Sequence, residues 1–411
     1  MKKFFALLLS LAMVLALVAC GQKETTTPDD TQTPDDTTPE VEYKIAMITD
    51  YGDITDQSFN QTTYEACKQF ADANNVEFKY YKPTENNTAA RVASIDQAIE
   101  EGFNLIVMPG YAFGGAIVEA APEFPDVKFI ALDVAAGDLL ETAVAKAGEA
   151  YDYTPENWDL NKYVDMSNVY CAVYQEELCG YMAGYAAVKL GYKNLGFLGG
   201  MSVPAVVRYG YGFVQGVDAA AADLGLTDVK LNYIYGGQFF GDADITAVMD
   251  TWYQGGTEVV FACGGGIYTS AVDAAKKANA KVIGVDVDQA GVIAKYAGVD
   301  GMTVTSAMKG LYPATYDTLT DVIVNGNWDK YVGKIATLGL VSGTDPEANY
   351  VQIPMGDGTQ WSDSFTQDDY KAMVKDMFDG KITVSNNTSS DVSAADFATV
   401  ITVDDQGSIK G

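Results

Sequence analysis

The 411-residue sequence contains no histidine and only five cysteines. Without histidine the chain lacks the commonest general base, the commonest metal ligand and any Ser–His or Cys–His nucleophile pair. Besides Cys20, the cysteines are Cys67, Cys171, Cys179 and Cys263, which follow neither a CxxC nor a zinc spacing. Buried free thiols are favoured over a Cys171–Cys179 disulfide. We therefore expect no metal and no cofactor.

Basic residues are also scarce. The sequence has 26 Lys and Arg against 56 Asp and Glu, and its formal net charge is −30. A chain this acidic is repelled by nucleic acid and by anionic lipid headgroups, and it has no basic patch to compensate. Nucleic acid is therefore not an expected partner.

The longest apolar run stands at the start of the chain. Two lysines precede an apolar stretch from Phe4 to Val18, which is shorter than the roughly 20 residues a membrane-spanning helix needs. The stretch ends in Leu-Val-Ala-Cys and resembles a bacterial lipobox, so residues 1–19 are predicted to be a signal peptide and Cys20 the lipidated first residue. A plain signal peptide without lipid is the alternative. Residues 20–42, rich in Thr, Pro and Asp, are predicted to be a disordered tether at the extracytoplasmic face of the cell membrane.

From residue 43 the chain alternates short apolar runs with helical patterns. The organising stretch is residues 44–75, where the apolar run Lys44–Thr49 precedes a loop rich in Asp and then a helical pattern. The same rhythm continues through the chain and restarts near Asn194. This alternation predicts an α/β protein with two doubly wound parallel sheets in series. We expect residues 135–165 to be a long surface excursion of unassigned role.

Chemically distinctive side chains recur where the predicted strands end. They are Asp50 with Phe59 and Asn60, Tyr111 and Phe113, Asp133, Arg208, Phe239 and Phe240 with Asp242, the glycines 264–266, Asp286 and Asp288, and Lys309. Open α/β sheets bind ligands at the carboxyl ends of their strands. Aromatic rings can hold a flat apolar face while carboxylates accept hydrogen bonds from hydroxyls, so the set suits a neutral ligand with both features.

Each of these residues also has a simpler interpretation. The aspartates before the first helix could cap it, and Phe59 could belong to the core. The glycine triplet could cradle a phosphate, but the sequence has neither G-x-G-x-x-G nor G-K-[ST], and acidic residues outnumber basic ones. Only the recurrence at successive strand ends favours a ligand site.

Several of these stretches resemble the basic membrane protein family, whose members are purine-nucleoside-binding lipoproteins of ABC importers. They are TDYGDITDQSFNQ from Thr49, FIALD at 129–133, EE-x-x-GYMAGYAA from Glu176, R-x-x-x-GF from Arg208, IGVDVDQ from Ile283 and TSAMKG from Thr305. The resemblance implies a type I periplasmic-binding-protein fold, with two α/β lobes joined by three crossovers. We expect one lobe at 43–175 plus 307–335, the other at 176–306 plus 336–385, and a tail at 386–411.

The resemblance also implies roles for individual residues. Asp50 and Asn60 would contact the ligand, Phe59 would stack on one face of the base, and a ring of the Phe239–Phe240 pair on the other, with Phe240 favoured. Asp133 would bind the base edge, and Asp286 and Lys309 the ribose hydroxyls, with Asp288 competing for the place of Asp286. Arg208 and Gly265 complete the predicted site. Residues 135–165 and an extra residue in GGQFFGD depart from the family pattern.

The leading hypothesis is a monomeric, non-enzymatic lipoprotein that binds guanosine, inosine or adenosine and delivers it to an ABC transporter permease. A sugar-binding protein and a ligand sensor are alternatives within the same class. A nucleoside-cleaving enzyme is a third alternative, from a different class, since carboxylates alone can perform acid/base chemistry. It is disfavoured because the clustered D-x-D-x-x-x-D-D metal motif is missing from the sequence.

Overall fold

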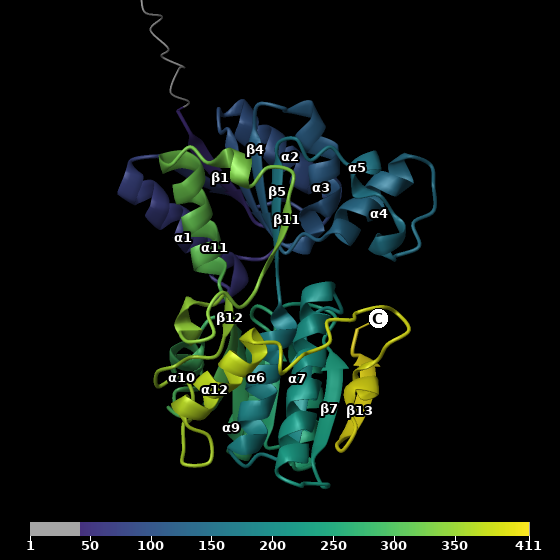
Figure 1. Ribbon diagram of the computed structural model, residues 1–411, viewed down its shortest axis with the longest axis vertical. Coiled ribbons are helices and arrows are strands. Elements are labelled where there is room, and N and C mark those ends of the chain that lie inside the picture. The colour runs from purple at the N-terminus through teal and green to yellow at the C-terminus, as the bar shows by residue number, and fades with distance from the viewer. Residues whose placement is uncertain (1–41, 411) are drawn as a thin grey trace, which may run out of the picture. The chain divides into compact units, whose positions relative to one another are not determined.

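The first of two β-sheets is wholly parallel. The computed structural model describes residues 42–410, so the predicted signal peptide, most of the tether and Cys20 lie outside the described residues. Within that range the strands of the first sheet are, in spatial order, β11 (Ile335–Leu338), β5 (Val169–Tyr174), β4 (Lys128–Leu132), β3 (Leu105–Pro109), β1 (Lys44–Ile48) and β2 (Glu77–Tyr81) (Figure 1). Strands β1 to β5 of this sheet lie within residues 44–174, and β11 is added from a much later part of the chain.

The second sheet is parallel except at one edge. Its described strands are β12 (Val351–Gln352), β10 (Thr303–Lys309), β9 (Lys281–Asp286), β8 (Val259–Cys263), β6 (Asn194–Gly199), β7 (Lys230–Tyr235) and β13 (Thr402–Ser408). Only β12 runs antiparallel to its neighbour, β10. The predicted architecture of two doubly wound parallel sheets is confirmed.

Helices follow nearly every parallel strand, as the alternating sequence pattern predicted. The helices around the first sheet are α1 (Phe59–Asn74), α2 (Thr88–Glu100), α3 (Gly114–Ala120), α4 (Ala136–Lys146), α5 (Leu160–Tyr163) and α11 (Leu311–Leu319). The others are α6 (Glu176–Lys189), α7 (Pro204–Asp223), α8 (Ala243–Gln254), α9 (Tyr268–Ala278), α10 (Ala290–Ala297) and α12 (Gln367–Phe378). No helix among the described residues is long and apolar enough to cross a membrane.

Both faces of the first sheet are buried, which explains its continuous apolar strands. In β1, Ile45 and Met47 pack in one hydrophobic cluster with Phe70 of α1, whereas Ala46 and Ile48 pack in another with α2 and α3. Alternate residues of a strand point to opposite faces, so both faces must be covered by helices. The side chains free to bind a ligand are therefore those beyond the strand ends.

The close packing of α6 on α7 depends on glycines. A Cβ atom at Gly180 or Gly184 would collide with backbone carbonyls of α7, and one at Gly212 with the backbone of Glu177. Gly180 and Gly184 are spaced on one face of α6, the face that meets α7. The contact fixes the first turns of both helices, which carry Glu176 and Arg208.

The chain passes between the two sheets three times within the described range. It does so after β5, after β10 and between β11 and β12. Strand pairing places residues 307–309 in the second sheet and residues 336–338 in the first, so the second and third crossovers lie slightly later in the chain than predicted. Lys309 is the last residue of β10, as its expected place at a strand end implies, and α11 begins at Leu311.

Three predictions about irregular segments were wrong. The predicted surface excursion at 135–165 is wrong for residues 136–146, which form α4 with Leu139, Leu140 and Val144 buried in the core, whereas none of residues 147–163 is buried. Arg208, expected where a strand ends, lies inside α7, which begins at Pro204. The end of the chain, predicted to be a tail, forms β13 along β7 because its backbone completes the exposed edge of the second sheet. The four described cysteines are free and buried, as favoured.

Candidate ligand-binding site

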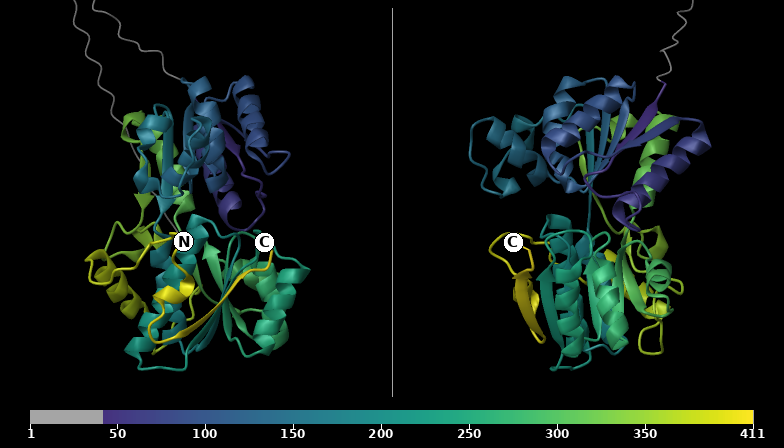
Figure 2. Two further views of the ribbon diagram at one scale, coloured as in Figure 1. Left: turned by 90° about the vertical axis from the view of Figure 1, so that its right-hand side faces the viewer. Right: turned by 180° about the vertical axis from the view of Figure 1, so that it is seen from behind.

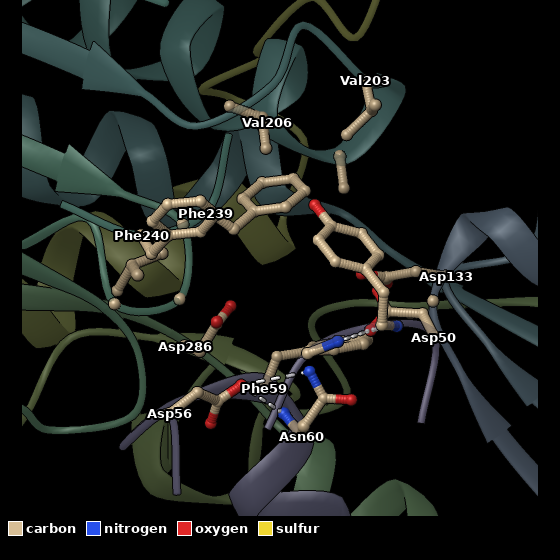
Figure 3. Close-up of a pocket in the computed structure, with 18 of the residues that line it drawn as sticks. Asp50, Asp56, Phe59, Asn60, Asp133, Val203, Val206, Phe239, Phe240 and Asp286 are labelled. Carbon is tan, nitrogen blue, oxygen red and sulfur yellow. Dashed lines mark hydrogen bonds between the residues drawn. The ribbon is translucent and has the colours of Figure 1, made fainter. Parts of the chain in front are cut away.

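A cavity of about 360 Å³ opens where strands of both sheets end. The first sheet contributes the loop after β1, Gly110 and Tyr111 after β3, and Asp133 after β4. The second contributes the first turns of α7, the loops after β7 and β8, and the ends of β9 and β10. Figure 3 shows Phe239, Phe240 and Val206 on one side of this pocket, and Asp56, Phe59 and Asn60 on the other.

Most of the predicted site residues line this pocket. They are Asp50, Phe59, Asn60, Asp133, Phe240, Gly265, Asp286 and Lys309. Arg208 and Asp288 do not line it. Asp288 is exposed, and its carboxylate accepts a hydrogen bond from the Ala290 amide at the start of α10. Of the two aspartates that competed for one role, only Asp286 therefore faces the pocket.

Two aspartates of the loop after β1, Asp50 and Asp56, line the pocket and also accept hydrogen bonds from backbone amides. Asp56 caps α1, since its carboxylate accepts hydrogen bonds from the amides of Asn60 (2.9 Å) and Gln61 (3.1 Å). Burial raises the pKa of Asp56 to about 6, although those amide hydrogen bonds oppose the shift. Asp50 is also buried and accepts hydrogen bonds from the amides of Tyr51 and Gly52. The capping interpretation is therefore correct for Asp56, while Phe59 lines the pocket.

The two phenylalanines after β7 occupy different environments. Phe239 packs over Gly200 and Gly264, where a Cβ atom on either glycine would collide with its ring. Its carbonyl accepts a hydrogen bond from the Gly266 amide at 2.8 Å. Phe240 is 56% exposed, so its ring has few packing partners in the structure. Both rings line the pocket, and only Phe240 has a largely uncovered surface to offer a ligand.

Two pocket aspartates hold the same unusual backbone conformation. Asp133 follows β4 with φ 60°, and Asp286 ends β9 with φ 64°. Left-handed conformations are uncommon outside glycine, although aspartate tolerates them better than most residues. Such backbone outliers tend to occur at functional sites, where surrounding structure holds them. The equivalent placement in the two sheets directs one carboxylate from each sheet to the same cavity.

A buried lysine connects these carboxylates. The ammonium of Lys309 lies 2.5 Å from Asp133, 3.4 Å from Glu176 and 3.8 Å from Asp286. Glu176 in turn accepts a hydrogen bond from Nε of Arg208 at 2.7 Å. Lys309, Asp133, Glu176 and Asp286 are each at most 9% exposed in the side chain. Arg208 thus acts on the pocket through Glu176 instead of reaching the cavity itself.

These contacts determine the protonation of the cluster. Burial alone would lower the pKa of Lys309, but Asp133, Asp286 and Glu176 together hold it well above the usual lysine value. Burial raises the pKa of Asp133 to about 6, and the positive charge of Lys309 limits that rise. Burial likewise raises the pKa of Glu177, the next residue of α6, to about 7. The lysine therefore stays charged at neutral pH.

Two buried acceptors at the pocket have no hydrogen-bond partner among residues 42–410. They are Oδ1 of Asp133 and Oδ1 of Asn60. Burying an unsatisfied polar atom is unfavourable by about 1–3 kcal/mol, so native proteins rarely leave one unpaired. Two unpaired acceptors beside aromatic rings are suited to a ligand with N–H or O–H donors.

Sequence reasoning missed three residues of this region. Glu176, within the motif EE-x-x-GYMAGYAA, joins Lys309 to Arg208. Ser58 donates a hydrogen bond to Asp286 at 2.5 Å, and Tyr209 lines the pocket beside the same carboxylate. A charged residue that opens a glycine-rich, closely packed helix was an available signal for Glu176. Ser58 stood next to a predicted ligand residue, but nothing in the sequence linked it to Asp286.

Residues 43–345 match the family described as Bmp, ABC transporter substrate-binding protein PnrA-like. The chain belongs to this family. The match covers the strands of both sheets except β12 and β13, and it includes all the predicted pocket residues. The resemblance found in the sequence motifs is therefore confirmed.

Named relatives agree with this assignment. The chain is 26% identical over 359 residues to the ABC transporter nucleoside-binding protein BmpA of Lactococcus lactis, covering 84% of this chain and 90% of that protein. It is 27% identical over 324 residues to basic membrane protein B of Borreliella burgdorferi, covering 75% of this chain and 83% of that protein. Both alignments cover most of the chain, and they agree with its assignment to a family of ABC transporter substrate-binding proteins.

Solved structures support the fold. An ABC transporter solute-binding protein from Aeropyrum pernix superposes with a TM-score of 0.59 at 20% identity, covering 83% of this chain and 87% of that chain. A solute-binding protein from Conexibacter woesei gives a TM-score of 0.57 at 20% identity, covering 84% of this chain and 99% of that chain. The predicted type I periplasmic-binding-protein fold is confirmed.

Proposed function

We propose that this protein captures a purine nucleoside in the pocket between its two lobes and delivers it to the permease of an ABC transporter. Guanosine, inosine and adenosine are the candidate ligands. In this proposal the chain is a monomeric binding protein without enzymatic activity, held at the extracytoplasmic face of the cell membrane by a lipid on Cys20. The lobes are the parts of the described chain built on the two sheets.

The observation that carries the proposal is the combination of rings and unpaired acceptors in one cavity. Phe59 and the exposed Phe240 offer apolar surfaces to a flat base. Oδ1 of Asp133 and Oδ1 of Asn60 lack hydrogen-bond donors, which the base and the ribose of a nucleoside can supply. The acidic pocket contains more carboxylates than cations, which favours a neutral nucleoside over a nucleotide.

The relatives give independent support. The Lactococcus lactis protein is named a nucleoside-binding protein of an ABC transporter, and 90% of its length aligns with this chain. This likeness supports the class of solute, a nucleoside. The geometry of the pocket extends the proposal to purines, because two rings from opposite lobes suit a large flat base.

Isothermal titration of the intact chain tests the proposal. Guanosine, inosine and adenosine are titrated beside free ribose, after mass spectrometry of the purified protein before and after denaturation to detect a bound ligand. We expect at least one nucleoside to bind and ribose to bind far more weakly. If none of the three nucleosides gives heat and none is found bound, the proposal fails.

The same measurements distinguish the alternatives. Preference for ribose over every nucleoside would indicate a sugar-binding protein, which the carboxylates around Lys309 could also support. Release of free base during long incubation with excess nucleoside would indicate a cleaving enzyme. Transport is tested separately, by comparing nucleoside uptake into cells that have and lack this protein and by labelling the membrane fraction for a lipid on Cys20.

A further inference from the structure

A segment beyond the family match packs along the second lobe and ends at the pocket loop. This segment, residues 385–410, is called the strap here; the family match ends at residue 345. The strap contains β13, which pairs in parallel with β7 from Thr402 against Lys230 to Ser408 against Tyr235. Figures 1 and 2 show it in yellow at the edge of the second sheet.

Specific side chains hold the strap against α7. Gln215 exchanges hydrogen bonds with the backbone of Ser385, at 2.8 and 3.0 Å. Asp218 accepts hydrogen bonds from the amides of Thr399, Val400 and Ile401 at 2.8–3.2 Å. Burial would raise the pKa of Asp218, but the hydrogen bond from the Thr399 hydroxyl at 2.6 Å, together with these amide bonds, lowers it below the usual aspartate value. Hydrogen bonds at Ser385 and at residues 399–401 therefore hold the strap against α7.

The end of the strap reaches the loop that carries the pocket phenylalanines. Strand β7 ends at Tyr235, whose carbonyl accepts a hydrogen bond from the Ile409 amide at 2.8 Å. The loop after it, residues 236–242, carries Phe239 and Phe240. Lys410 packs against Gly237, where a Cβ atom would lie 2.7 Å from the Lys410 carbonyl oxygen. The strap and the pocket loop are thus in direct backbone contact.

A relay of hydrogen bonds runs from Lys410 to Phe240. The ammonium of Lys410 donates to Oε1 of Gln238 at 2.9 Å and pairs with the carboxylate of Asp242. The side-chain amide of Gln238 donates to the carbonyl of Phe240 at 2.9 Å and to Asp242 at 2.9 Å. Asp242 also caps α8 by accepting from the Ile245 amide. Lys410 therefore organises both side chains that flank the two rings.

This relay matters because Phe240 has little packing of its own. Its ring is 56% exposed, whereas Phe239 is held by glycines 200 and 264 and by the hydrogen bond from Gly266. A side chain without packing partners takes its position from its backbone. The backbone of Phe240 bridges to Gly266 on one side and is held by Gln238 on the other.

We infer that Lys410 is a positioning residue for the ligand-binding pocket: it acts through Gln238 and Asp242 to hold the Phe240 loop in its binding position. The effect on ligand affinity rests on the proposed function, whereas the effect on the loop does not. The strap thus makes part of the pocket dependent on a segment outside the family match.

The test uses the intact chain with Lys410→Met, which removes the ammonium and keeps the length of the side chain. Lys410→Arg is the conservative variant, because a guanidinium can donate to both Gln238 and Asp242. Lys277→Met is the matched control. Lys277 of α9 pairs at 2.7 Å with Asp250 of α8, the helix that Asp242 caps, but Lys277 does not line the pocket. All three are compared with wild type.

Two measurements are made on each variant. Hydrogen exchange of residues 236–242 without ligand reports on the loop, and titration with guanosine, inosine and adenosine reports on binding. We expect Lys410→Met to speed exchange in that loop and to weaken nucleoside binding about two- to fivefold, the range for a partly exposed ion pair. Lys410→Arg should restore both, and Lys277→Met should change neither.

Each outcome decides a separate point. Unchanged exchange at residues 236–242 in Lys410→Met would overturn the inference, whatever the ligand. Faster exchange with undiminished nucleoside affinity would show that the strap orders the loop but does not position the pocket, which also overturns it. Wild type that binds no nucleoside would refute the proposed function, and the exchange data would still decide whether Lys410 holds the loop.

Discussion

Replacing the buried lysine of the pocket gives the sharpest test of its charge network. In Lys309→Met the ammonium is lost, while a side chain of similar length remains among the rings of Phe59, Tyr174 and Tyr209. Their centroids lie 4.8, 5.3 and 5.7 Å from the present ammonium. Methionine packs well against aromatic rings, so the substitution changes charge much more than packing.

The expected loss of stability is large because three carboxylates lose their common cation. Asp133, Glu176 and Asp286 all lie within 3.8 Å of the Lys309 ammonium and are almost fully buried. Removing one partner of a buried ion pair typically lowers the free energy of unfolding by about 3–5 kcal/mol. Arg208 still pairs with Glu176 at 2.7 Å, so we expect the lower part of that range at pH 7.5.

The pH dependence of the deficit distinguishes charge from packing. The pKa of Asp133 is already raised to about 6 by burial, and loss of Lys309 raises it further. The folded variant then binds a proton that the unfolded chain, with an aspartate pKa near 3.9, releases. Stability of Lys309→Met should therefore rise relative to wild type as pH falls from 7.5 to 5.

Urea denaturation of wild type and Lys309→Met at pH 7.5 and pH 5 measures both effects. Lys381→Met is the control, because Lys381 pairs with Asp376 on the solvent-exposed surface and its loss should change stability little. A deficit for Lys309→Met no larger than that of the control would refute the reasoning. So would a large deficit that stays constant between the two pH values, because it would indicate lost packing.

Three further predictions concern ligand binding and the pocket loops. Phe59→Ala and Phe240→Ala should each weaken nucleoside binding by about 1–3 kcal/mol in titrations, the range for stacking on a base. Asp286→Asn should weaken binding while Asp288→Asn should not, since only Asp286 lines the pocket; equal losses would contradict this assignment. Gly265→Ala should lower the free energy of unfolding by about 1–2 kcal/mol in urea, because Gly265 has φ 49° and a Cβ would lie 2.9 Å from the Phe239 carbonyl oxygen.

The parts of the fold that could be predicted follow from one physical constraint. Strands covered on both faces by helices must be apolar throughout, so each appears in the sequence as a short uninterrupted run. When such runs alternate with helices, the strands are parallel. Polar residues that follow the strands then lie together at the carboxyl end of each sheet. Asp50, Asp133, Asp286 and Lys309 were placed at the pocket by this reasoning.

The errors arose where local pattern does not determine structure. Arg208 was placed on a strand-end loop, although Pro204 at the first turn of α7 was an available signal for an earlier helix start. Strand β13, with the sequence TVDDQGS, has mostly exposed side chains and is held by its backbone along β7. No apolar alternation marks such an edge strand, so sequence alone could not reveal it.

The site also depends on contacts between residues far apart in the chain, which explains why its electrostatics could not be read from motifs. Asp133, which follows β4 of the first sheet, pairs with Lys309 at the end of β10 in the second sheet. Ser58, which precedes α1 beside the first sheet, donates a hydrogen bond to Asp286 at the end of β9 in the second sheet. Any motion that separated the two sheets at the pocket would break both contacts. Lys309 would keep Glu176 and Asp286, whereas Asp133 would lose its cation. Asp133 and Asp286, which line the pocket, thus also join the two sheets across it, and a ligand that replaced these hydrogen bonds would shift the balance between joined and separated sheets.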